Sequence, residues 1–131
     1  MRLVPFDRED WLLIQGFFNG DVGITPYVQE IFLLECHIAG TSYVDLEKVE
    51  PELSPGDPLL FRREPDNPRD GLAVMILDQK QRKLGYLPRN RNEVPARLMD
   101  AGKLLFGKLE AKEWIGAWLK ITMRVYMKDF A

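Results

Sequence analysis

Basic and aromatic side chains are interspersed along the middle of this 131-residue chain, on both sides of one polar turn. They are Tyr43, Arg62, Arg63, Arg69, Tyr86, Arg89 and Arg91. Guanidinium groups bind the phosphates of a nucleic-acid backbone, and aromatic rings stack on bases with about 1–3 kcal/mol per base. Asp70 lies among them, and a carboxylate accepts a hydrogen bond from a sugar hydroxyl but repels a phosphate. These residue types indicate a site for one nucleic-acid strand, in which Asp70 distinguishes a free end from a continuing strand.

The polar turn, DNPRDG at residues 66–71, also has a purely structural interpretation. Asn67 and Asp70 are common turn residues whose side chains bond to nearby backbone amides, and Pro68 and Gly71 fit a tight connection between strands. The local sequence by itself favours this interpretation. Both interpretations can hold together, because an ordered turn is a means of positioning a binding loop.

The two tyrosines have different settings in the sequence. Tyr43 stands beside turn residues, so we expect its ring to be exposed. Tyr86 follows Gly85 in a short apolar run, where a half-buried core tyrosine is as good an interpretation as a stacking platform.

Two adjacent arginines, Arg62 and Arg63, fall in a predicted strand, so their side chains are expected on opposite faces. Leu60 shares the face of Arg62 and is apolar, which favours Arg63 as the arginine that serves the site. Later in the chain, Trp114 precedes Gly116 in a predicted hairpin, and we include it as a further aromatic candidate.

Length and charge limit the class of protein. A chain of this size forms one main domain with a real hydrophobic core. The net charge is −2, but residues 1–61 hold three basic and eleven acidic residues, a net −8, whereas residues 62–124 hold fourteen basic and eight acidic residues, a net +6. This asymmetry indicates a basic face for a polyanion or, alternatively, a solvated charged surface.

Catalytic and metal-binding interpretations have little support in the sequence. The single histidine, His37, follows the single cysteine, Cys36, in an apolar strand, and neighbours that face opposite ways cannot share one metal or form a nucleophile–base pair. We therefore predict a non-enzymatic protein with no metal and no cofactor. The lone cysteine, the lack of a secretory signal and the lack of a membrane-length apolar run predict a cytoplasmic protein.

Six short runs rich in branched and aromatic residues predict strands at 31–38, 58–64, 72–78, 83–87, 104–113 and 118–127. Residues 92–102 predict a short helix with Asn92 as its cap and Gly102 as its stop. We expect residues 1–28 to form a helical extension, whose helix is capped by Asp7. Residues 29–131 are expected to form the main domain. The expected fold is mainly β, a small OB-like or SH3-like, partly open barrel of about six strands with one inserted helix.

Three motifs in this order resemble the HIRAN domain family: GTSY at 40–43, FRREPDNPRDGLAVMI at 61–76 and KLGYLPR at 83–89, followed by a short helix that ends in MDAG at 99–102. The resemblance covers roughly three quarters of the chain. HIRAN domains are OB-like modules, found alone in bacteria and fused to DNA-remodelling ATPases in eukaryotes. The resemblance implies DNA binding, at the 3′-hydroxyl end of a single strand.

The family's roles are carried over at the matching positions. Asn67 and Asp70 match the residues that grip the terminal nucleotide, with the aspartate accepting from the 3′-hydroxyl; Tyr86 and Arg89 match positions that contact the strand. Tyr43 keeps one stacking aromatic, whereas Ser42 and Val44 stand where the family has an arginine and a second aromatic. The predicted DNA-binding set is Tyr43, Arg63, Asn67, Arg69, Asp70, Tyr86, Arg89 and Trp114.

Two other hypotheses remain open at this point. One is a non-catalytic adaptor of the same fold that recruits a helicase or nuclease through its acidic N-terminal helix or its aromatic C-terminal part. The other is self-inhibition, in which the acidic extension 1–28 lies over the basic groove. No helicase or ATPase motif accompanies the domain, so DNA processing would require such a partner.

Overall fold

The computed structural model describes residues 2–5 and 27–130. Its elements are β1 (Arg2–Pro5), β2 (Tyr27–His37), the short 3₁₀ turns η1 (Thr41–Tyr43) and η2 (Glu50–Glu52), β3 (Pro58–Glu64), β4 (Ala73–Leu77), β5 (Lys83–Tyr86), α2 (Glu93–Asp100), β6 (Leu104–Ile115) and β7 (Trp118–Phe130). The predicted N-terminal helix falls within residues 6–26, which lie outside the described residues. The strand β1 was not predicted; it pairs with residues 27–30 of β2.

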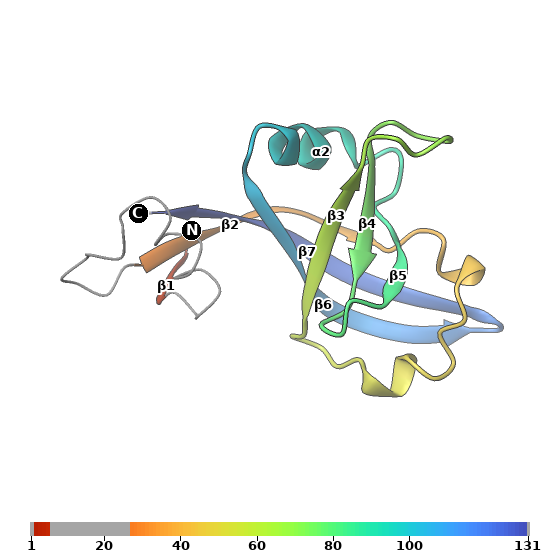
Figure 1. Ribbon diagram of the computed structural model, residues 1–131. Coiled ribbons are helices and arrows are strands. Elements are labelled where there is room, and N and C mark those ends of the chain that lie inside the picture. The colour runs from red at the N-terminus through yellow and green to blue at the C-terminus, as the bar shows by residue number, and fades with distance from the viewer. Residues whose placement is uncertain (1, 6–26, 131) are drawn as a thin grey trace.

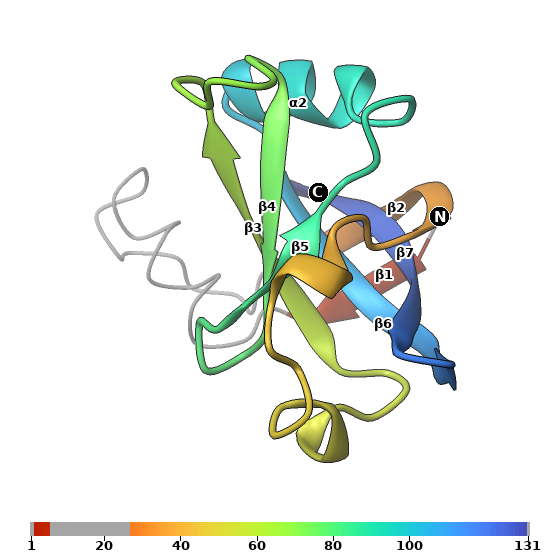
Figure 2. The ribbon, with the colours of Figure 1, turned by 90° about the vertical axis from the view of Figure 1, so that its right-hand side faces the viewer.

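The strands form one antiparallel sheet in the order β1-β2-β7-β6-β3-β4-β5. The six predicted strands are confirmed as β2 to β7. Figures 1 and 2 show β3 and β4 crossing the long β6 and β7 steeply, so that the sheet curls around its core. The predicted, partly open β-barrel is thereby confirmed as the fold.

One backbone bridge brings the chain after β2 against β5 at the far end of the sheet. Ala39 and Tyr86 exchange two backbone hydrogen bonds, of 2.8 Å and 2.9 Å. Gly85 permits this approach, because a Cβ there would overlap the carbonyl oxygen of Ala39. The bridge closes the curled sheet at this one point and fixes the start of η1 beside β5.

The core lies between the two crossing parts of the sheet. Its large, fully buried side chains are Ile38, Leu59, Val74, Ile76, Leu84, Leu87, Leu109, Leu119, Ile121, Met123 and Val125. Each such side chain contributes about 1.5–3 kcal/mol when it leaves water. The strand β4 has buried side chains on both faces, Ala73 and Leu77 on one and Val74 and Ile76 on the other, which explains its uninterrupted apolar sequence.

Helix α2 lies beside the loop that joins β3 to β4, at the same end of the molecule (Figures 1 and 2). Asn92 occupies the N-cap position as predicted, but its side chain makes no capping hydrogen bond. Gly102 follows the helix with a φ of 89°, a conformation that glycine adopts without strain. Within the described residues, no helix is long and apolar enough to cross a membrane.

Candidate nucleic-acid interface

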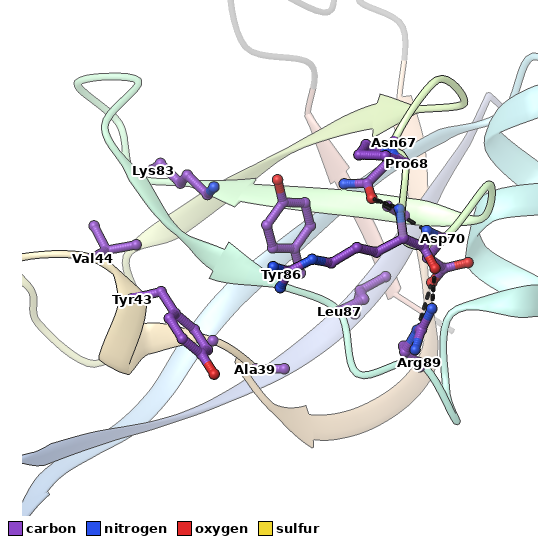
Figure 3. A pocket seen from close by; sticks show the side chains of 13 residues that line it. Ala39, Tyr43, Val44, Asn67, Pro68, Asp70, Lys83, Tyr86, Leu87 and Arg89 are labelled. Atoms are coloured by element: carbon purple, nitrogen blue, oxygen red, sulfur yellow. Dashed lines mark hydrogen bonds and ion pairs between the residues drawn. The ribbon is translucent and has the colours of Figure 1, made fainter.

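A pocket of about 450 Å³ opens between η1, the β3–β4 loop and β5 (Figure 3). Six predicted site residues line it: Tyr43, Asn67, Arg69, Asp70, Tyr86 and Arg89. The rest of the lining consists of Ala39, Gly40, Val44, Pro68, Ala73, Lys83 and Leu87. In Figure 3, Tyr43 stands across the pocket from Asn67 and Asp70, and Tyr86 lies between them. The fold therefore brings together residues from three separate segments of the sequence.

Tyr43 is held at the rim by its backbone. Gly40 begins the η1 turn with a φ of 77°, and the Thr41 hydroxyl donates a 2.7 Å hydrogen bond to the carbonyl of Leu119 in β7. The Tyr43 side chain is left 89% exposed, as expected from its position beside turn residues. An aromatic ring that is anchored through the backbone and open to solvent is suited to stacking on a flat ligand.

The β3–β4 loop is ordered by Asn67. Its Oδ1 accepts hydrogen bonds from the backbone N–H groups of Arg69 (2.9 Å) and Asp70 (3.2 Å), and its Nδ2 donates to Oε1 of Glu64 at 3.0 Å. The structural interpretation of the turn is thus confirmed. The same loop lines the pocket, so its order also fixes the positions of the side chains that face a ligand.

Asp70 is anchored through both carboxylate oxygens. Oδ1 accepts from the backbone N–H of Leu72 at 2.9 Å, and Oδ2 accepts from Nδ2 of the buried Asn92 at 2.7 Å. The Leu72 bond, followed by the bond from Asn92 and the charges of Arg89 and Arg63, lowers the pKa of Asp70, which keeps it ionised. A carboxylate offers about four lone-pair positions, so Asp70 retains capacity to accept from a ligand hydroxyl.

Tyr86 is oriented from two sides. Its hydroxyl donates a 2.8 Å hydrogen bond to Oε1 of Glu64, and Nζ of Lys83 lies 4.6 Å from the centre of its ring. The bonds from Asn67 and Tyr86 lower the pKa of Glu64, so this acceptor stays ionised. Tyr86 is half-buried, as the first sequence interpretation expects, and it also lines the pocket.

Three cations border the pocket: Arg69, Lys83 and Arg89. Arg89 is 73% exposed; it donates to the backbone carbonyl of Arg69, and its Nε lies 3.8 Å from Oδ2 of Asp70. Among the described residues, neither Arg69 nor Lys83 forms an ion pair with a carboxylate. The rim therefore carries positive charge that is available to an anionic ligand.

Two predicted site residues lie outside the pocket. The Arg63 guanidinium forms a two-bond ion pair with Asp100 in α2, at 2.9 Å and 3.0 Å, and also donates to the carbonyls of Ala73 and Gly71. Arg63 therefore joins β3 to α2 and does not face the pocket. Trp114 lies near the end of the β6–β7 hairpin, 44% exposed, away from the pocket lining.

Sequence reasoning missed three residues that shape the pocket: Lys83, Glu64 and Asn92 in its role as a partner of Asp70. Lys83 precedes Tyr86 by three residues, a spacing that places two side chains on opposite faces of a regular strand; the register shift between β4 and β5 brings them together, and no local signal in the sequence indicates it. Glu64 and Asn92 act through contacts between distant segments, for which the sequence carries no local signal. In the described part of the chain, no group of three or more His, Cys, Asp or Glu residues could hold a metal ion.

Comparison with known proteins agrees with this architecture. The sequence model of the HIRAN domain matches residues 31–128. No curated protein matches the chain.

Three solved structures share the fold. A protein from Lactobacillus plantarum has 25% sequence identity and a TM-score of 0.72, with 78% of this chain and 98% of that chain covered. The HIRAN domain of human HLTF has 17% identity and a TM-score of 0.60, with 76% and 79% covered. An NMR structure of the HLTF HIRAN domain in its DNA-bound conformation has 16% identity and a TM-score of 0.57, with 77% and 80% covered. Since the family match spans well over half of the sequence and the fold agrees, the chain belongs to the HIRAN domain family.

Proposed function

We propose that this chain is a non-catalytic module that binds single-stranded DNA at its 3′-hydroxyl end. The observation that carries the proposal is the pocket itself, where two tyrosines and three cations surround one ionised carboxylate. The DNA-bound conformation of the HLTF HIRAN domain, which has the same fold, supports DNA as the ligand class.

Each group has a distinct task in this proposal. Tyr43 and Tyr86 stack on the last bases, and Arg69, Lys83 and Arg89 contact the phosphates. Asp70 accepts a hydrogen bond from the terminal 3′-hydroxyl, and the second Nδ2 hydrogen of Asn67 donates to the terminal nucleotide. The Coulomb repulsion between Asp70 and a 3′-phosphate disfavours a phosphorylated end or a continuing strand.

The departures from the family's pattern, at Ser42 and Val44, change what the site offers to a bound strand. Val44 lines the pocket where the second aromatic is expected, so it offers an apolar contact in place of a stack. Ser42 is exposed and supplies no charge. Lys83 compensates in part, because it brings a cation to the ring of Tyr86.

The test is fluorescence anisotropy with a short labelled strand that ends in either a 3′-hydroxyl or a 3′-phosphate, at two salt concentrations. We expect tighter binding of the hydroxyl end, with log affinity falling by about 0.7 per phosphate contact for each unit of log salt. Salt-sensitive binding without end preference would remove Asp70 from its proposed role. Absence of binding under both conditions would contradict the proposal.

The matched variant is Asp70→Asn, which keeps the side-chain volume; its oxygen can still accept from Leu72, and Asn92 turns its amide so that its oxygen accepts from the new NH2 group. We expect it to lower the preference for the hydroxyl end about tenfold, because the charge that repels a phosphate is gone. Arg89→Ala should instead weaken both ends equally. If Asp70→Asn left the preference intact in a folded protein, the assignment of Asp70 would be wrong.

A second candidate function is a protein-interaction adaptor that recruits a helicase or nuclease in the cytoplasm. The observation that favours it is the β6–β7 hairpin, where Trp114 and Ile115 are both large, apolar and exposed, outside the pocket. An apolar interface responds little to ionic strength, whereas phosphate contacts respond steeply. Loss of partner binding in a Trp114→Ala, Ile115→Ala variant, with DNA binding unchanged, would support this function.

A further inference from the structure

The pocket side of the sheet continues past β5 and β4 onto β3. In register, Arg62 of β3 pairs with Met75 of β4, and Met75 pairs with Tyr86 of β5. Residues directly opposite each other in antiparallel strands lie on the same face. Arg62, Met75 and Tyr86 therefore form one row across the outer face of the sheet, and Tyr86 is the end of the row that lines the pocket.

A side-chain contact confirms that this face is shared. Glu64 lies two residues beyond Arg62 in β3, hence on the same face, and it accepts the hydrogen bond from the hydroxyl of Tyr86. The charge of Arg62 is also one of the factors that lower the pKa of Glu64. Arg62 thus stands on the pocket side, whereas Arg63 faces α2.

The two adjacent arginines differ in what they bind. Arg63 has its guanidinium engaged by Asp100 and by two backbone carbonyls. Arg62 is exposed, and within the described residues it forms no ion pair and no side-chain hydrogen bond. Its positive charge is therefore open to an external anion.

The path between Tyr86 and Arg62 suits a polyanion chain. It spans two strand spacings, about 10 Å, which a strand with the rise of B-form DNA crosses in about three nucleotides. Met75, half-buried and apolar, lies between the two ends and presents no charge to repel a phosphate.

We propose that the bound strand leaves the pocket across the outer face of β4 and β3, over Met75, and that Arg62 contacts its backbone about three nucleotides from the 3′ end. The inference rests on the proposed function, since it assigns the route of the same ligand. It adds a binding residue that lies outside the pocket lining.

The experiment compares a short 3′-hydroxyl dinucleotide, which ends before Arg62, with a long strand of about twelve nucleotides, a length within the site sizes of OB-type folds. Arg62→Ala should weaken the long strand about threefold to fivefold, leave the short strand unchanged and reduce the salt slope for the long strand by about 0.7. Arg62→Lys should keep most of the affinity, because it keeps the charge. The matched control is Arg97→Ala in α2, an exposed arginine paired with Glu93 outside the pocket lining, which should change neither affinity.

Two outcomes would overturn the inference. If Arg62→Ala matched Arg97→Ala on the long strand, Arg62 would not contact the ligand. If it weakened both strands equally, Arg62 would act on the pocket through Glu64 and not on the outgoing strand. In either case, end preference in the unmodified protein that is lost in Asp70→Asn would leave the proposed function standing, whereas failure of the unmodified protein to bind either strand would remove both.

Discussion

Strand β4 has an aspartate near each of its ends, and the two surroundings differ in how much charge they leave available. After the strand, Asp78 accepts from the backbone N–H groups of Lys80 (2.9 Å) and Arg82 (2.8 Å), and from Nε of Arg82 at 2.7 Å. Glu52 in η2 accepts from the side chains of the same two residues, at 2.6 Å and 2.7 Å. This cluster of Glu52, Asp78, Lys80 and Arg82, here called the distal cluster, pairs every charge that it holds.

Before the strand, Asp70 lies in an equally polar loop, but fewer of the charges around it are paired. Its ion-pair partner, Arg89, has Nε 3.8 Å from Oδ2 of Asp70 and is largely exposed, and Arg69 and Lys83 have no carboxylate partner among the described residues. Both ends of β4 carry acidic and basic side chains, but only the pocket end also has tyrosines. The difference teaches that charged residues alone do not mark a binding site; the charges left unpaired and the rings left exposed distinguish it.

The largest expected effect comes from breaking the distal cluster. Asp78→Ala removes a buried carboxylate and leaves two backbone donors without their acceptor, which should lower the free energy of unfolding by about 2–3 kcal/mol. Urea denaturation measures this change. DNA affinity should stay as it was under conditions where the variant is folded.

The control for this prediction is Lys80→Ala. Lys80 is exposed and its ion pair with Glu52 is worth less than about 1 kcal/mol, so its removal should cost far less than that of Asp78. A loss of DNA affinity in folded Asp78→Ala would show that the two ends of β4 are not separate in function.

The converse prediction concerns Tyr43 at the pocket. Because its ring is exposed and anchored only through the backbone, Tyr43→Ala should change the free energy of unfolding by no more than about 0.5 kcal/mol. Strand affinity should fall about tenfold, or about 1.4 kcal/mol, from the loss of one stacked base. Tyr43→Phe keeps the ring and should bind normally; anisotropy that shows equal losses in both variants would contradict a stacking role.

The sequence predicted the strands and α2 because their apolar runs and turn residues are local signals. It also identified six of the residues that line the pocket, because the motif after β2, the motif that spans β3 and β4, and the motif at β5 are brought to one place by the fold. The pairing of β1 with β2 depends on contacts between separate segments of the chain, so no local pattern indicates it.

The choice between Arg62 and Arg63 shows where sequence reasoning stops. The apolar Leu60 was expected to mark the inner face, but it lies on the outer face and is itself exposed. Which face of β3 turns inward depends on the partners that the strand finds, here the inward-facing Leu59 and the contact of Arg63 with Asp100. Asn92 is a similar case: its helix-cap position follows from sequence, but its hydrogen bond to Asp70 requires the folded chain.

The smallest expected effect is a pH-dependent change in stability that comes from Glu52 in the distal cluster. Hydrogen bonds from Lys80 and then Arg82 lower the pKa of Glu52 from 4.5 to about 2. A carboxylate with a lowered pKa in the folded state stabilises the protein fully above its unfolded pKa, and this contribution is lost as pH falls from about 4.5 through about 2. The melting temperature of the unmodified protein should therefore fall more steeply over this range than that of Glu52→Gln.

Because Glu52 is partly exposed, added salt should reduce the difference between the two proteins in how the melting temperature depends on pH. Strand affinity at neutral pH should be the same in both proteins, since the distal cluster contributes no residue to the pocket. Parallel melting curves would mean that the ion pairs of Glu52 add nothing to stability. The cations of the distal cluster would then be as available as those of the pocket, and pairing alone would no longer explain why one end of β4 is a candidate site and the other is not.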